Sequence, residues 1–164
     1  RQGQMLPYLR SVEGPASEGD DVWPLSPPVQ EIHVQGETPG ERTLFLTGAT
    51  QGGHWSAVVS SGGSADQPTL LFDVAARVRR QPTWLGTSYQ CADGATWTGA
   101  SQADRGDSKL SVVLQNSSAK PSELPLVPLE GAARVTSIRC YQASHSLEQF
   151  PATVRWQYAI SLNS

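Results

Sequence analysis

The stretch TVRWQYAISL, which runs from Thr153 to Leu162, alternates between two kinds of side chain. One set is apolar and consists of Val154, Trp156, Tyr158, Ile160 and Leu162, while Thr153, Arg155, Gln157 and Ser161 fall on the opposite side. Successive side chains of an extended strand point to opposite faces of a sheet, whereas a helix repeats every 3.6 residues or so, about one turn. The stretch therefore predicts a half-buried β-strand.

The same period of two recurs along most of the chain. It is found at residues 32–34, 44–46, 55–59, 70–78, 110–114 and 135–139, and Gly, Pro, Asn and Ser separate these segments. Alternation of this kind is typical of antiparallel pairing, because strands buried on both faces are continuous apolar runs. We therefore expect an all-β antiparallel β-sandwich, jelly-roll or immunoglobulin-like, with about eight or nine strands and little or no helix.

Length and composition narrow the class of protein. The chain has 164 residues, 16% of them charged, and its 12 basic and 15 acidic residues give a net charge of −3. A nucleic-acid binder normally carries a basic excess, so the balance argues against that partner. The densest apolar run, Thr69 to Val78, is broken by Asp73 and is shorter than the roughly 20 residues of a membrane span. We expect neither nucleic-acid binding nor a transmembrane segment in this chain.

Proline and glycine divide the chain into two parts. Residues 1–28 contain eight of them and are expected to form an extended N-terminal arm or linker, and residues 29–164 to form the sandwich domain. Apolar residues near Tyr8 are expected to pack on the domain itself, with a partner as the alternative. The domain then begins with a predicted half-buried strand in which Ile32 and Val34 share one face.

The two cysteines, Cys91 and Cys140, each lie near the end of a predicted strand. An even number of cysteines fits a disulfide in an oxidising compartment. With no signal peptide before Arg1 we expect an exported chain whose leader or anchor has been removed, with a domain of a longer protein as the alternative. The location is then extracellular, periplasmic or at the cell surface. The alternative is a pair of buried thiols. The spacing of Cys and His residues supports no zinc site, and we expect no cofactor.

Motifs for catalysis are absent from the sequence. It has no Gly-rich phosphate loop, no nucleophile elbow and no HExxH, and nothing in the spacing selects a triad from His54, Asp73 and the many serines. Asp73 interrupts an apolar strand, and we expect it on the outer face, paired with Arg77 two positions along that face. We predict no catalytic residue.

The segment 103–108 offers two weaker alternatives. Arg105, Gly106 and Asp107 spell a cell-attachment tripeptide, and Asp104 with Asp93 and Asp107 could supply oxygen ligands to Ca²⁺. Short matches of this kind arise by chance, so we predict no metal site.

Five tryptophans are many for a chain of this length. Trp55 and Trp156 lie on apolar strand faces and are expected in the core. Trp84, Tyr89 and Trp97 fall in a stretch rich in Thr, Ser, Gly and Gln, the setting of aromatic platforms that stack on sugars. We predict that these three residues bind the ligand. The alternative is that they seal the ends of the sandwich.

Together these observations predict a non-enzymatic binding or assembly module of a secreted or cell-envelope protein that recognises a partner protein or a polysaccharide. One alternative is a small β-sandwich hydrolase that acts on polysaccharide, which requires a pocket with convergent titratable groups. Another is a purely structural spacer domain.

Overall fold

The chain folds into two antiparallel β-sheets that face one another, in a computed structural model that describes residues 8–12, 23–82, 84–92, 96–99, 102–105, 108–117, 135–142 and 147–163. These ranges contain strands β1 to β11 and a single turn of 3₁₀-helix, η1 (Pro39–Glu41). The all-β sandwich expected from the alternating pattern is confirmed. In the same ranges no helix has the length and apolar character needed to cross a membrane.

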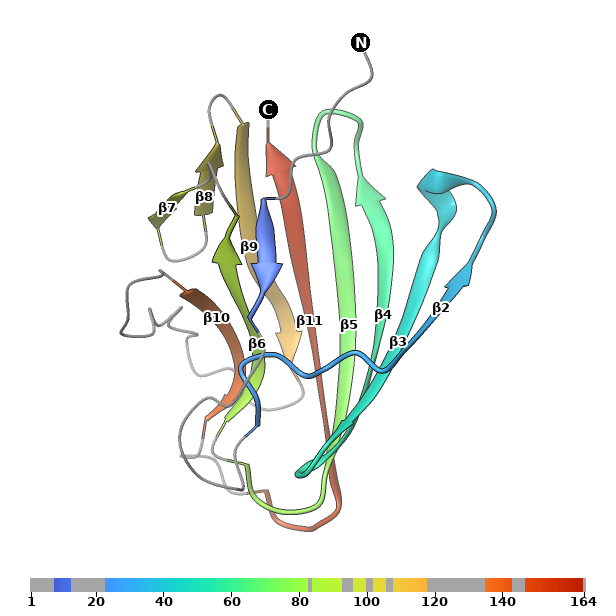
Figure 1. Cartoon of the computed structure of the whole chain (residues 1–164), viewed down its shortest axis with the longest axis vertical. Coiled ribbons are helices and arrows are strands. Elements are labelled where there is room, and N and C mark those ends of the chain that lie inside the picture. Colours follow the sequence, from blue (N-terminus) through green and yellow to red (C-terminus); the bar gives the residue numbers. More distant parts are fainter. Residues whose placement is uncertain are drawn as a thin grey trace.

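The two sheets differ greatly in width. The larger has the order β2 (Glu31–Gln35), β3 (Thr43–Thr50), β4 (Gly53–Gly63), β5 (Pro68–Val78), β11 (Ala152–Asn163), β9 (Ser108–Ser117), β8 (Gln102–Arg105) and β7 (Thr96–Gly99). The smaller has the order β1 (Leu9–Ser11), β6 (Trp84–Cys91) and β10 (Val135–Gln142). Figure 1 shows the three strands of the smaller sheet over one part of the larger sheet, with β2 and β3 to one side.

The core forms where the two sheets overlap. Pairing places Ala57 of β4 opposite Val74 of β5, and Val74 opposite Trp156 of β11. All three are at most 4% exposed, and Leu85 of β6 is fully buried against the same cluster. Trp55 also lies in this cluster, so the predicted core positions of Trp55 and Trp156 are confirmed.

A strap, defined as residues 23–30, ties the two sheets together along one side (Figure 1). The Trp23 indole N–H donates to the Gly86 carbonyl at 2.9 Å, and the Ser26 hydroxyl donates to the Ser88 carbonyl at 2.9 Å, both on β6. At its other end the Pro28 carbonyl accepts from the Trp55 indole at 3.1 Å. The strap is therefore hydrogen-bonded to both sheets, and its Trp23 side chain is part of the core.

The sequence predicts an extended arm or linker over residues 1–28. The structure describes residues 8–12 and 23–28 of it. Leu9 to Ser11 pair with Tyr89 to Cys91 as β1, and Tyr8 and Leu9 pack against the core cluster. The described parts of this range thus belong to the sandwich, in line with packing on the chain's own domain.

Strand β2 lies beyond the cover that the smaller sheet provides. Ile32 lies opposite Leu46 of β3, and Leu46 lies opposite Ala57 of β4. The three side chains therefore form one row on the inner face of the larger sheet, and Ala57 is the member of that row that is buried. Ile32 nevertheless is 63% exposed and Val34 50% exposed. The prediction of a half-buried β2 is therefore wrong. Ile32 and Val34 do share one face, as the alternation indicates, but most of the Ile32 side chain and half of the Val34 side chain remain exposed there.

The predicted Cys91–Cys140 disulfide is also wrong. Cys91 is a free thiol at the end of β6. Antiparallel pairing sets Val135 opposite Gln90 and Arg139 opposite Gly86, so Cys140 lies about five residues, or roughly 16 Å, along the strands from Cys91. A disulfide requires Cα atoms within about 7 Å. The cysteines consequently give no support to an oxidising compartment.

We predict that Gly48→Ala destabilises the fold. A Cβ atom at Gly48 would overlap the Pro28 carbonyl oxygen and the Trp55 indole nitrogen. These two atoms form the hydrogen bond that holds the strap where it crosses β3. The change should cost about 2 kcal/mol and lower Tm by about 4–8 °C in calorimetry. Gly40→Ala is the control, because a Cβ at Gly40 meets nothing within 4 Å. Equal Tm values for the two variants would contradict the described path of the strap.

The cysteine register predicts two free thiols. Denatured without reductant, the protein should react with two equivalents of a thiol reagent, measured by mass spectrometry. In the folded protein burial raises the pKa of the Cys91 thiol, so alkylation of Cys91 near neutral pH should be slower than that of a free cysteine. Recovery of a Cys91–Cys140 disulfide peptide from unreduced protein would show that the register is wrong.

Candidate functional site

The three predicted ligand-binding aromatic residues are divided between the two sheets. Trp84 and Tyr89 belong to β6 of the smaller sheet, and Trp97 belongs to β7 at the edge of the larger sheet. The side chains of Trp84 and Trp97 lie outside the described residues, so their ligand-binding role stays a prediction. The backbone does not bring the three together on one strand or one sheet.

Tyr89 points into the core and not to the surface. It is 9% exposed, and its hydroxyl lies 2.6 Å from the hydroxyl of Tyr158 on β11. Tyr158 in turn stacks on Phe72, with ring centroids 4.5 Å apart. The predicted exposed platform at Tyr89 is corrected on this ground: its ring is covered by the larger sheet, and its polar end is satisfied within the core.

Burial also changes the acidity of this tyrosine pair. Loss of hydration raises the pKa of Tyr89 to about 12, with the Tyr158 hydrogen bond acting in the opposite direction. Burial likewise raises the pKa of Tyr158 well above its usual value. Both hydroxyls are therefore neutral over the physiological range, and the pair links β6 to β11.

Asp73 lies on the outer face of β5, as the alternating pattern indicates, but its partner is a different residue from the one predicted. The Gln157 side-chain amide donates to the Asp73 carboxylate at 3.0 Å. Gln157 lies directly opposite Asp73 on the neighbouring strand, whereas Arg77 is four residues, or about 13 Å, along the same strand. Cross-strand proximity therefore decides the partner.

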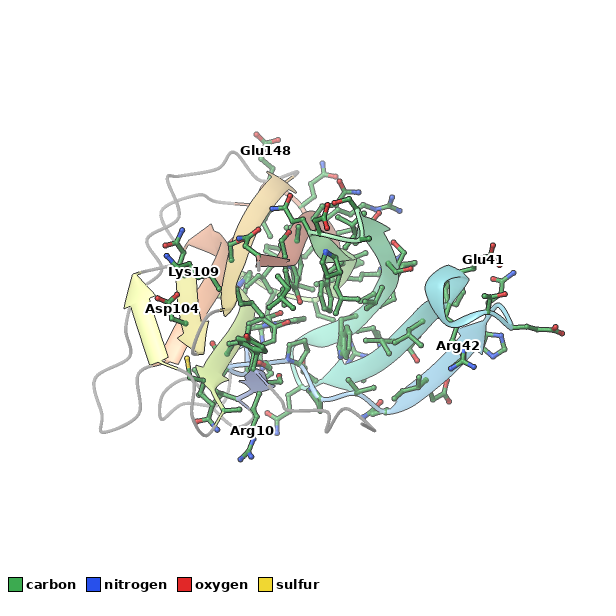
Figure 2. The ribbon with its side chains drawn as sticks, turned by 90° about the horizontal axis from the view of Figure 1, so that it is seen from above. Arg10, Glu41, Arg42, Asp104, Lys109 and Glu148 are labelled. Atoms are coloured by element: carbon green, nitrogen blue, oxygen red, sulfur yellow. The ribbon has the colours of Figure 1, made fainter. Side chains whose placement is uncertain are left out.

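The segment considered for Ca²⁺ or cell attachment is described only in part. Gly106, Asp107 and Asp93 lie outside the described residues. Asp104 of β8 is paired in register with Lys109 of β9, and Figure 2 shows the two side chains near one another. Within the described ranges no three His, Cys, Asp or Glu side chains gather to hold a metal ion.

The strongest candidate for a binding surface is β2 together with the inner side of β3. β2 is the terminal strand of the larger sheet, with β3 as its neighbour on one side. An end strand presents a row of backbone N–H and C=O groups that a further strand can pair with. We define the β2 surface as the edge of β2 that pairs with no strand among the described residues, together with the inner-side residues Ile32, Val34, Leu44 and Leu46.

The polar side of the same strand carries a negative charge. Glu31, His33 and Gln35 occupy the outer face of β2, and the His33 ring lies against Phe45 of β3 at a centroid distance of 6.2 Å. Figure 2 places Glu41 and Arg42 at the tip of this hairpin, far from Asp104 and Lys109. The Arg42 guanidinium donates to the Glu37 carbonyl at 3.5 Å.

Sequence reasoning did not identify the β2 surface. The pattern of Ile32 and Val34 is the same as that of an ordinary half-buried strand, and its exposure depends on the width of a sheet made from distant segments. Comparisons of the chain with protein-family models, with curated proteins and with solved structures found no match.

We predict that stability falls in alkaline solution because of the tyrosine pair. Between about pH 10 and pH 12 the unfolded chain releases protons that folded Tyr89 and Tyr158 retain, so the unfolded state binds fewer protons and the free energy of unfolding decreases as pH rises. Urea unfolding should show a loss of about 1–3 kcal/mol from about pH 9 to pH 11. In Tyr89→Phe/Tyr158→Phe this pH dependence should be smaller. The same pH slope in both proteins would contradict a buried neutral pair.

Proposed function

We propose that this chain is a non-enzymatic binding module that recruits an extended segment of a partner protein to the β2 surface. The observation that carries the proposal is the exposure of Ile32 and Val34 on the core side of an end strand. Natural sheets usually protect such edges with short strands, lysine, proline or a covering loop. β2 contains neither lysine nor proline.

The chemistry of the surface indicates what the partner segment looks like. A strand added beside β2 alternates its side chains between the same two faces. On the inner side its residues would contact Ile32 and Val34, so they should be apolar. On the outer side they would face Glu31 and His33, with Glu37 and Glu41 nearby in the hairpin, so basic residues are favoured there. The partner is therefore an extended segment in which apolar and basic residues alternate.

Binding at the β2 surface needs no acid–base chemistry. A strand added to this edge is held by backbone hydrogen bonds and apolar contacts. The groups whose pKa burial raises, Tyr89, Tyr158 and Cys91, belong to β6 and β11 and not to this surface.

The proposal is tested with a synthetic peptide of alternating valine and lysine. Isotope-labelled protein should show amide shift changes centred on residues 31–35, with a Kd of about 10 µM to 1 mM. Ile32→Thr/Val34→Thr should weaken binding by about tenfold, because it removes apolar contacts of the order of 1.4 kcal/mol. Val58→Thr is the matched control, because Val58 is exposed on the outer face of β4.

Two further measurements separate strand addition from other modes. Two versions of the peptide are compared, one N-methylated at the odd-numbered amides and one at the even-numbered amides. Their affinities should differ, because only one of the two sets of N–H donors faces β2. The proposal would be overturned if the two methylated peptides bound with equal affinity. It would also be overturned if the Ile32→Thr/Val34→Thr variant bound the peptide as tightly as the wild-type protein does. Dimers in sedimentation that this variant disperses would show that a second copy, and not a partner protein, occupies the edge.

A further inference from the structure

A second surface lies on the outer face of the larger sheet, at the end where β4 and β11 begin and β5 ends. Arg77 of β5 lies between His54 of β4 and Thr153 of β11 in register. Arg155 lies one row further along β11, diagonally across from Arg77. We define the arginine patch as His54, Arg77, Arg79 and Arg155, all of which are exposed.

Arg79 is held on this face by two contacts. Its backbone N–H donates to the Gly52 carbonyl at 3.0 Å, which extends the pairing of β4 and β5 by one residue. Its guanidinium lies 3.2 Å from His54 Nε2. A guanidinium can only donate, so His54 Nε2 is the acceptor in this contact. Arg79 is thereby fixed beside Arg77, about 7 Å away along the strand direction.

The strands around the patch carry small side chains and few acidic ones. The residues between the arginines are small, namely Ser56, Ala75 and Thr153, so a linear chain can lie close to the sheet. Strands β4, β5 and β11 contain one acidic residue, Asp73, and its carboxylate is bonded to Gln157. A chain with a net charge of −3 thus concentrates positive charge at this end of one face.

We infer that the arginine patch binds an acidic polysaccharide. Guanidinium groups bind carboxylates and sulfates through paired hydrogen bonds, and a row of cations about 7 Å apart suits charges repeated along a polymer. The site is separate from the β2 surface: it lies on the opposite face of the sheet and around different strands. It therefore adds a second ligand to the proposed protein partner and does not depend on it.

Polysaccharide fits this face better than nucleic acid does. Single-stranded nucleic acids are held by aromatic side chains that stack on bases, but the Trp, Phe and Tyr residues of β4, β5 and β11 belong to the inner side. Asp73 and Gln157, one row beyond Arg155, would offer an acceptor and a donor to sugar hydroxyls. Mixed donors and acceptors beside cations suit a charged sugar chain.

The test measures calorimetric binding of polygalacturonate, which carries carboxylates, and heparin, which carries sulfates, with dextran as the neutral polymer. At least one acidic polymer should bind at low ionic strength and weaken as salt is added, and dextran should not bind. Arg77→Gln/Arg79→Gln should lose about tenfold or more in affinity. The matched control is Arg42→Gln/Lys109→Gln, which removes the same charge at two places away from the patch (Figure 2).

The inference holds if the patch variant loses affinity, the control stays within about twofold of wild type, and both keep the wild-type Tm. Equal losses in both variants would show a response to net charge alone and overturn it. Tighter binding to a single-stranded DNA oligomer or to vesicles of anionic phospholipid, or no binding to either acidic polymer, would also overturn it. Ile32→Thr/Val34→Thr should leave polymer binding unchanged.

Discussion

The difference in width between the two sheets determines which part of the larger sheet has a buried inner face and which part has an exposed one. Eight strands spaced by about 4.8 Å span roughly 34 Å, and three strands span about 10 Å, so the smaller sheet can cover only part of the inner face. Apolar residues under the cover make the core, as the row Ala57, Val74 and Trp156 shows. The same row continues to Ile32, which lies outside the cover and is exposed.

The strap holds the wide and the narrow sheet together along one side. It bonds to β6 through Trp23 and Ser26 and to β4 through Trp55, and it crosses β3 at a glycine. The tyrosine pair, Tyr89 and Tyr158, joins the same two sheets through the core. The covered half is therefore fastened by apolar packing and by specific hydrogen bonds, while the β2–β3 hairpin extends from it with one apolar side open. Such a hairpin is suited to binding another chain.

Much of the fold could be predicted from the sequence, because strand alternation is a local property. The faces of β4, β5 and β11 were assigned correctly, and so were the core positions of Trp55 and Trp156. Strand order and register depend on contacts between distant segments, and every correction comes from there. Cys91 and Cys140 lie on paired strands but five residues out of register. Tyr89 lies in a polar stretch, yet β6 is the central strand of the cover, so its residues 85–89 are buried.

The candidate surfaces escaped prediction for the same reason. Arg77 and Arg155 are far apart in sequence and become neighbours only when β5 pairs with β11. Ile32 and Val34 look like core residues until the width of the cover is known. The exposed apolar side of β2 and the arginine patch lie on opposite faces of the larger sheet, so the two proposed ligands would not compete for one surface.

Hydrogen exchange of the backbone amides, measured in dilute protein by mass spectrometry, tests the unequal cover most directly. If the smaller sheet protects only part of the larger one, amides of β2 should exchange at least about a hundredfold faster than those in the middle of β5, because β2 can open without disrupting the core. Protection of β2 equal to that of β5 would contradict this account, since it would mean that the hairpin is covered and belongs to the same cooperative core.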